Sequence, residues 1–161
     1  MSRYTEGMAE PSEHRSIAKN RKARHTYHIL EELECGIQLK GTEVKSLRDG
    51  QCSIGEAYVH SKNGELFLIG SHIPEYSHGT MWNHKPTRER KLLLHRRELL
   101  QWAKKAREQG ITMVPLEVYF AGSIVKVLVG LCRGKKLYDK RAAERDRSDK
   151  RDMDRAMRRR R

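Results

Sequence analysis

Two short runs of the chain carry side chains suited to binding an anion. The first run, from Lys19 to His25, reads K-N-R-K-A-R-H. Lysine and arginine neutralise phosphate charge, while asparagine and histidine offer directional hydrogen bonds. The run therefore predicts a turn that faces the phosphates of a nucleic acid, and a solvated run of charge explains the same residues equally well.

The second run, Gly134 to Arg141, reads G-K-K-L-Y-D-K-R and divides the chain into two kinds of sequence. Residues 23–132 alternate between strand and helix patterns, whereas Ala142 to Arg161 offers only alanines and two methionines as apolar side chains. Such a segment cannot bury enough surface to offset its ordering entropy. We expect a flexible N-terminus (1–16), a folded RNA-binding domain (17–133) and a basic tail (134–161) that is disordered when free.

The tail has the composition of a marginal helix. It contains no glycine or proline after residue 138, and Asp146 precedes Lys150 by four residues, a spacing that stabilises a helix. Arg147 and Arg151 repel each other at the same spacing. We expect the tail to become helical against RNA, whose phosphates neutralise the arginines. A charged extension that only keeps the protein soluble is the alternative.

The histidines do not form a pattern typical of catalysis or metal binding. His72, His78 and His84 are six residues apart, which places no pair on one helical face, and neither cysteine nor paired carboxylates complete a ligand set. Motifs of hydrolases, P-loop proteins and zinc proteases are absent. The sequence therefore predicts a protein that is not an enzyme and has no cofactor and no metal. The cysteines, which we expect to be reduced, are Cys35, Cys52 and Cys132.

Strands and one clear helix must position these residues. Apolar residues alternate from Tyr27 to Leu39, which predicts a half-buried strand with a bulge or bend at Gly36. A short helix follows between Gly41 and Gly50, for which Thr42 is the expected N-cap.

The rest of the domain continues the strand pattern. Asn63-Gly64 predicts a hairpin turn, and 70–90 reads as a long polar loop. A helix is expected over 95–109, with Trp102 packed in the core rather than stacked on a base. Two strands, 111–120 and 124–132, close the domain. The fold class is mainly β: a small antiparallel OB-like β-barrel with about three attached helices and the basic tail.

Composition favours a polyanionic partner. The 161 residues include 34 lysines and arginines against 21 aspartates and glutamates, a net charge of +13. From Arg133 onward there are 14 basic and six acidic residues, so this quarter of the chain supplies +8 of that charge. Nucleic acid and an anionic membrane surface are the candidate partners. No apolar run approaches the roughly 20 residues that span a bilayer, and no signal peptide is evident, so we expect a cytoplasmic monomer without membrane attachment.

Four motifs in one order resemble a known family. They are N-R-K-A-R-H (20–25), G-T-E-V-K-S-L-R (41–48), R-K-L-L-L-H (90–95) and G-K-K-L-Y-D-K-R (134–141). The chain resembles the SsrA-binding protein (SmpB) family over residues 17–158. The resemblance implies a non-enzymatic factor of bacterial trans-translation, which binds the tRNA-like domain of transfer-messenger RNA and enters stalled ribosomes with elongation factor Tu as an indirect partner. It also implies a tail that occupies the empty mRNA channel and the decoding centre of the small subunit.

The resemblance assigns roles to particular residues. The RNA-binding set is Asn20, Lys22, Arg24, His25, Glu34, Gly36, Glu43, Lys45, Ser46, Arg48, Arg88, Arg90 and Lys91. The ribosome-binding set is Lys135, Lys136, Tyr138, Asp139, Lys140, Arg141, Arg145, Lys150, Arg151, Arg155 and Met157. The chain departs from the family at two positions: Lys85 replaces a frequent aspartate, and Tyr138 replaces a frequent histidine, whose stacking role a tyrosine ring keeps.

Two other functions are compatible with parts of the sequence. A general nucleic-acid-binding barrel explains the charge, but the ten aromatic residues show no exposed triplet of the kind that forms a stacking platform. A metal-dependent nuclease that uses the histidines predicts cleavage that depends on a divalent cation.

Overall fold

The computed structural model describes residues 13–79 and 81–159, excluding the side chains of residues 137 and 138. Residues 1–12 of the expected flexible N-terminus lie outside this range. The last residues of the predicted flexible segment, from His14 onward, belong to strand β1 (His14–Lys19), which pairs with β6 (Ile111–Ala121). Strand β1 thus starts within the segment predicted to be flexible, and the boundary of the folded domain stays a prediction.

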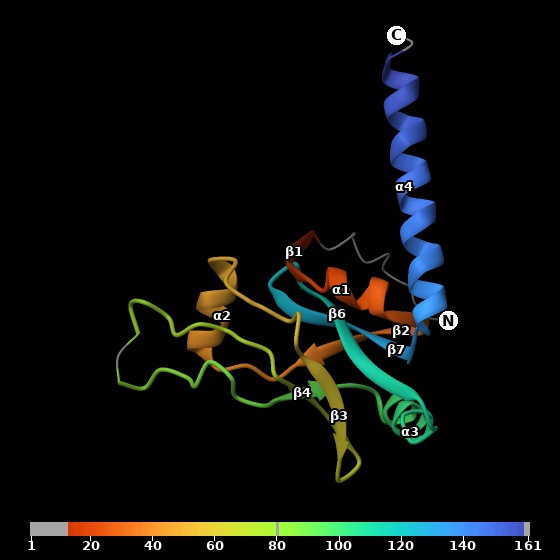
Figure 1. Ribbon diagram of the computed structural model, residues 1–161. Helices are drawn as coiled ribbons and strands as arrows, with labels where there is room; N and C mark the ends of the chain where they lie inside the picture. Colours follow the sequence, from red (N-terminus) through yellow and green to blue (C-terminus); the bar gives the residue numbers. More distant parts are fainter. Residues whose placement is uncertain (1–12, 80, 160–161) are drawn as a thin grey trace, which may run out of the picture.

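The strands form one antiparallel sheet that closes on itself. Neighbouring strands follow the order β1, β6, β3, β4, β5, β2 and β7. An additional pairing between β6 and β7 closes the six strands from β6 to β7 into a ring, and β1 pairs with β6 at the edge (Figure 1). The remaining strands are β2 (Tyr27–Ile37), β3 (Tyr58–Lys62), β4 (Glu65–Ile69), β5 (Arg90–Leu93) and β7 (Ile124–Gly134). The long strand β6 has three partners: β7 pairs along one side of it, and on the other side β3 pairs at Met113 and β1 pairs from Glu117 to Ala121. The predicted antiparallel barrel is confirmed.

Strand β2 keeps its predicted alternation but not its predicted bulge. The register against β7 shifts between Ile29 and Glu31, so the extra residue is Leu30 and not Gly36. A glycine occupies position 36 for another reason: a Cβ atom there would lie 3.2 Å from the Cβ of Leu93 on the paired strand β5. Close approach of two strands, rather than a bend, explains this glycine.

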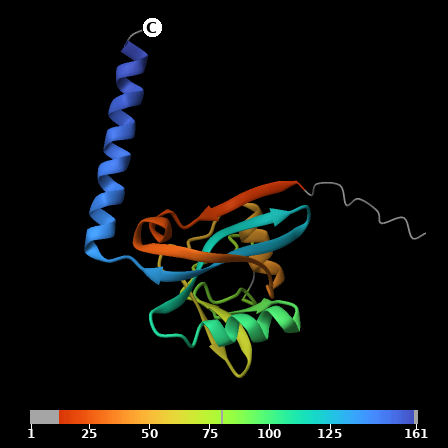
Figure 2. The ribbon, with the colours of Figure 1, turned by 90° about the vertical axis from the view of Figure 1, so that its right-hand side faces the viewer.

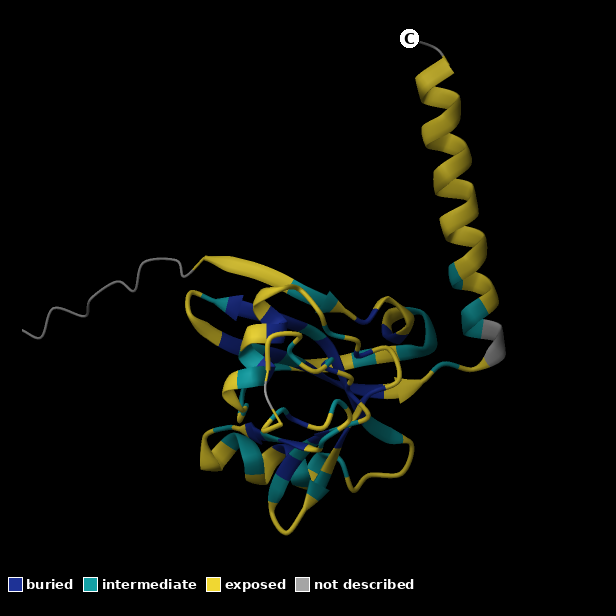
Figure 3. Ribbon diagram, turned by 90° about the vertical axis from the view of Figure 1, so that its left-hand side faces the viewer, coloured by how far each residue is buried: buried dark blue, intermediate teal, exposed yellow. Residues whose placement is uncertain are grey.

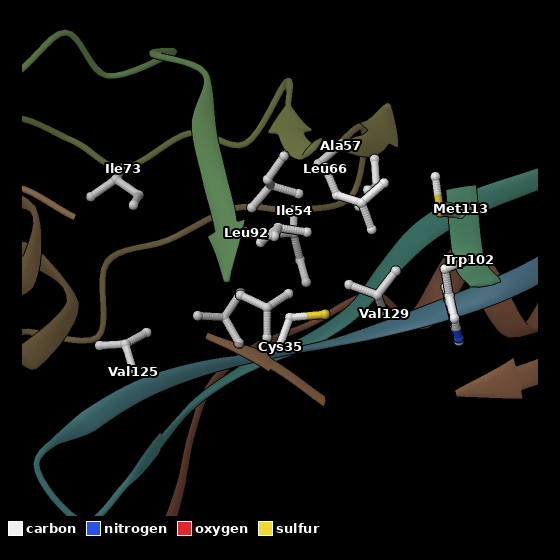
Figure 4. Packing of buried hydrophobic residues seen from close by; sticks show 14 of the residues in the cluster. Cys35, Ile54, Ala57, Leu66, Ile73, Leu92, Trp102, Met113, Val125 and Val129 are labelled. Carbon is white, nitrogen blue, oxygen red and sulfur yellow. The ribbon is translucent and has the colours of Figure 1, made fainter. Parts of the chain in front are cut away.

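The apolar core fills the inside of the barrel. Leu66, Val127 and Val129 are fully buried, and Figure 4 shows side chains from several strands converging with Cys35 and Leu92. Trp102 of helix α3 (Arg96–Lys105) reaches this cluster and is 4% exposed, which confirms that it packs in the core. The helix is shorter than predicted, and the chain turns at Gly110 with φ of 80°.

Two short helices lie beside the barrel. Helix α1 (Arg21–Thr26) replaces the turn predicted for the first basic run. Helix α2 (Gly41–Arg48) has Lys40, not Thr42, at its N-cap. The carboxylate of Glu43 accepts a hydrogen bond from the Lys40 amide at 2.8 Å, so the residue inside the first turn caps the helix.

Helix α4 (Leu137–Arg159) extends away from the barrel. Figure 2 and Figure 3 show it from two sides, and in Figure 3 nearly all of its described surface is exposed. The tail is thus a helix over most of its length, and its disorder in the free protein stays a prediction. No helix in the described part of the chain combines the length and apolar character needed to cross a membrane.

Candidate nucleic-acid interface

Asn20 fixes helix α1 to the barrel. Its side-chain oxygen accepts a hydrogen bond from the amide of Ala23 at 3.1 Å, and its side-chain nitrogen donates to the carbonyl of Pro115 at 3.1 Å. The residue is 6% exposed. Since protein groups occupy both ends of the amide, Asn20 positions α1, and its contact with RNA stays a prediction.

The exposed cations of α1 are the groups that Asn20 positions. Lys22 and Arg24 lie on the outer surface, paired with Glu56 at 3.1 Å and Glu32 at 3.4 Å. Exposed pairs of this kind contribute little to stability, so both cations can exchange a carboxylate for a phosphate. His25 is half-buried, with its Nε2 atom 3.5 Å from Glu144 of α4.

Glu43 joins α2 to the start of β5 and to the residues just before it, and it does not face solvent. Its carboxylate accepts hydrogen bonds from Arg90 Nε at 2.9 Å and from Arg88 Nη2 at 2.7 Å. Glu43 and Arg90 are fully buried. Burial raises the pKa of Glu43, but hydrogen bonds from Arg88 and the Lys40 amide and the charge of Arg90 outweigh it and hold the pKa below its usual value.

Three more side chains of the predicted RNA-binding set, those of Glu43, Ser46 and Arg90, are buried, and their contact with RNA stays a prediction. Arg90 donates to Ser71 and to the carbonyl of Pro86, and Ser46 donates to the carbonyl of Pro74 at 2.8 Å. Along with Glu43, these side chains hold α2 against the long loop through hydrogen bonds within the protein.

Two cations of α2 remain on the surface. Lys45 and Arg48 are exposed, and Arg15 of β1 donates to the carbonyl of Arg48 at 2.9 Å, which connects α2 with β1. Lys91 is half-buried and pairs with Glu65 at 2.7 Å, whereas Arg88 is occupied by Glu43. Of the predicted cations on this side, Lys45 and Arg48 are the best placed to meet phosphate.

Glu34 lies on β2 within a group of polar side chains that sequence reasoning missed. Its carboxylate accepts a hydrogen bond from the Tyr119 hydroxyl and lies 3.7 Å from the ammonium of Lys126. Burial, then the hydrogen bond to Glu34 and its charge, raise the pKa of Tyr119, which keeps the phenol protonated as a donor. Tyr119 also stacks on His14 with ring centroids 4.3 Å apart. Glu34 is half exposed, as its predicted role requires.

These partners had no local signal in the sequence. Tyr119 and Lys126 are 85 and 92 positions from Glu34 and meet it because β2 and β6 both pair with β7. Gly36 lies beside this group, lining a shallow groove with Glu34, Leu93 and Lys126. The order of the strands in the sheet brings Glu34 and Gly36 of β2 together with Tyr119 of β6 and Lys126 of β7.

The base of α4 is tied to α1 and β2. The Lys135 amide donates to the carbonyl of Thr26 at 3.1 Å, and its ammonium donates to the carbonyl of Arg24 at 3.0 Å. His28 lies 3.4 Å from Asp139. The joint between the two predicted sites is therefore a defined contact, while the side chain of Tyr138 lies outside the described residues.

The other predicted ribosome-binding residues follow the freestanding helix. Beyond its first turn α4 presents cations to solvent on all sides, and Met157 is 66% exposed. The exposed members of the set are Lys136, Arg141, Arg145, Lys150, Arg151, Arg155 and Met157, and Lys135, Asp139 and Lys140 are half-buried. The exposed cations thus form two separate groups, one on α1 and α2 beside the barrel and one along helix α4.

Comparisons with known proteins agree with one another. The family model described as SmpB protein matches residues 17–159. The chain is 57% identical to the SsrA-binding protein of Kineococcus radiotolerans over 141 residues, 88% of this chain and 90% of that protein. It is 52% identical to the SsrA-binding protein of Thermobifida fusca over 147 residues, 91% and 92% of the two chains.

A solved structure is similar in fold as well. It is described as "tmRNA-SmpB: a journey to the center of the bacterial ribosome", and the matching chain is 48% identical with a TM-score of 0.63. The match covers 74% of this chain and 85% of that one.

Proposed function

Since the chain belongs to the SmpB protein family, we propose that it is an RNA-binding factor of trans-translation. Its barrel binds the tRNA-like domain of transfer-messenger RNA and brings it to stalled ribosomes, with elongation factor Tu as an indirect partner. Its tail occupies the empty mRNA channel and the decoding centre. The protein acts in the cytoplasm as a monomer.

One structural observation supports this proposal independently of family membership. Two basic surfaces are physically separate: exposed cations of α1 and α2 on the barrel, and the cations of α4 on a helix that leaves the barrel. A single RNA-binding task needs only one of them. Two surfaces joined at Lys135 suit a protein that holds one RNA with its body and inserts its tail elsewhere.

We propose that neither surface catalyses a reaction. The acidic and histidine groups most suggestive of chemistry have structural partners: Glu43 is held by two arginines, and His84 lies between Thr42 Oγ1 and the Ile73 carbonyl at 2.8 Å each. Binding, positioning and charge neutralisation are what these residues can supply.

Electrophoretic mobility measurements at several salt concentrations test the RNA partner. Transfer-messenger RNA should bind more tightly than an unrelated RNA duplex of equal length, with affinity falling as salt rises. Equal affinity for both would favour the second candidate, a general nucleic-acid-binding barrel, which the overall charge of +13 also fits.

A pair of variants tests the assignment of the barrel face. Replacing the exposed cations in an Arg24→Ala, Lys45→Ala double variant should weaken binding to transfer-messenger RNA about tenfold or more, because each removes a phosphate contact. The circular dichroism spectrum should not change. The matched control is Lys104→Ala, an exposed lysine of α3 outside both predicted sets, and it should bind as the parent does.

A further inference from the structure

The loop between β4 and β5 exposes a tryptophan that the fold does not use. Trp82 is 83% exposed and Met81 is 89% exposed, whereas the second tryptophan of the chain, Trp102, is 4% exposed. Large aromatic side chains are ordinarily placed where they bury much of their surface. An indole left in water is therefore available to a partner.

The loop is closed by a side chain and does not depend on Trp82 for its shape. The Asn83 amide donates to the Tyr76 carbonyl at 2.8 Å, and its oxygen accepts from the Tyr76 amide at 3.2 Å. A Cβ atom at Gly79 would lie 2.3 Å from the side-chain nitrogen of Asn83, so Asn83 fills the inside of the loop.

The next residue fastens the loop to the protein. His84 is 1% exposed, and its ring nitrogens lie 2.8 Å from Thr42 Oγ1 of α2 and 2.8 Å from the Ile73 carbonyl. Trp82 thus directly precedes two anchored residues. The anchoring of Asn83 and His84 limits the positions that Trp82 can take, which reduces the entropy lost on binding.

Cations lie beside the loop. The ammonium of Lys45 on α2 is 5.4 Å from the centre of the Tyr76 ring, and Lys85 follows His84 at the surface. Glu75 is the single acidic residue between positions 75 and 85. In Figure 1 the loop projects past α2, on the opposite side of the barrel from α4. It therefore extends the barrel face that carries Lys45 and Arg48.

We infer that Trp82 stacks on an unpaired base of transfer-messenger RNA, while Lys45 and Lys85 neutralise neighbouring phosphates. This inference rests on the proposed function. Stacking suits the site because one indole and one methionine among polar residues are too small a patch for a protein interface, which buries about 1,600 Å² in total. Any base offers a flat face to an indole, so the contact needs no base-specific hydrogen bond.

Three variants of the full-length protein test the stacking by affinity. Trp82→Ala should weaken binding to transfer-messenger RNA about tenfold, and Trp82→Phe should recover most of the loss because phenylalanine also stacks. Met81→Ala is the matched control, equally exposed and apolar but without a ring, and should change affinity less than about twofold. Unchanged affinity of Trp82→Ala, or an equal loss in Met81→Ala, would overturn the inference.

Fluorescence gives a second readout that does not depend on affinity. Addition of transfer-messenger RNA should quench the emission of the parent protein, because its exposed indole stacks on a base. Emission of Trp82→Phe, which retains only the buried Trp102, should change little. Quenching by isolated ribosomal small subunits and not by transfer-messenger RNA would assign the loop to another RNA and refute the proposal. If the parent protein does not prefer transfer-messenger RNA at all, the proposed function fails first.

Discussion

Glu43 is a buried carboxylate shared by two arginines, and its environment decides what it can do. Its oxygens accept from Arg90 at 2.9 Å and from Arg88 at 2.7 Å, with Glu43 and Arg90 both fully buried. Removal of one charge from a buried pair leaves the other without a partner in a medium that solvates it poorly. The group therefore ties α2 to the loop.

Replacement of this carboxylate should unfold the protein more easily. We expect Glu43→Ala to lower the free energy of unfolding by about 3–5 kcal/mol, since Arg90 stays buried and unpaired. Urea denaturation followed by circular dichroism measures the change. Glu56→Ala is the control, because Glu56 pairs with Lys22 at the surface and its loss should change stability by less than about 1 kcal/mol. Similar losses in the two variants would contradict the structural role of Glu43.

The same residue should make stability depend on pH in the acid range. Its folded-state pKa lies below the usual 4.5, so the unfolded chain binds the proton more readily. The stabilisation is present above pH 4.5 and is lost as pH falls through the folded-state pKa. Urea denaturation between about pH 6 and pH 3 should show a smaller decline in Glu43→Gln than in the parent. Glu117, whose pKa is also lowered, contributes a separate share that Glu117→Gln removes. Equal declines in Glu43→Gln and the parent would contradict this assignment.

At the scale of elements, the β3–β4 hairpin depends on two left-handed residues. Asn63 has φ of 52° and Gly64 has φ of 75°, the conformation of a tight turn whose twist matches the strands. The short strands β3 and β4 carry Val59, Leu66 and Leu68 into the core, so the turn fixes which face is buried.

A single methyl group tests this turn. Gly64→Ala should lower the free energy of unfolding by about 1–2 kcal/mol, because an L-residue with a Cβ is strained at this φ. Thermal denaturation measures the effect. Gly55→Ala serves as control, since that position has no positive φ and its Cβ would meet no atom within 4 Å. A larger effect at Gly55 would be inconsistent with the turn geometry.

At the scale of the whole molecule, charge is divided between a compact body and a projecting helix. The joint is held by Lys135, which donates to two carbonyls of the α1 segment, and by the contact between His28 and Asp139. Among the side chains that the structure describes, every core residue precedes Arg133, so no described residue of α4 belongs to the core. Binding and insertion can therefore be separated.

Truncation should separate the two activities. A chain that ends at Leu137 should bind transfer-messenger RNA within about threefold of the full protein and with nearly the same salt dependence, because the phosphate contacts of the barrel remain. Peptide tagging on stalled ribosomes should be lost. Mobility shifts over a salt series and a reconstituted tagging reaction give the two measurements. Loss of RNA binding on truncation would contradict the division of labour between barrel and tail.

Features that depend on neighbouring residues could be predicted from the sequence, and features that depend on residues far apart in the sequence could not. The Asn63-Gly64 turn and the alternation in β2 were predicted because they depend on neighbouring residues. The N-cap of α2 was predicted wrongly. The hydroxyl of Thr42 hydrogen-bonds to His84, 42 positions away, while Lys40 is the N-cap and the Glu43 carboxylate accepts from its amide. Helix α1 was missed because six residues rich in charge carry no apolar period. Asn20 caps this helix by accepting from the Ala23 amide, and its contact with the distant Pro115 carbonyl holds the cap in place.

The sequence by itself determined the longer strands β2, β6 and β7, the hairpin turn, the antiparallel barrel, the concentration of charge in the tail and the family. Each follows from local periodicity, composition or motif order. Tertiary structure alone decided which polar residues face outward. Glu43, Ser46 and Arg90 lie inside while Lys45 and Trp82 lie outside, although all five occur in polar stretches. The reason is physical: burial of a charge depends on partners that folding brings together from distant positions, and no local pattern records them.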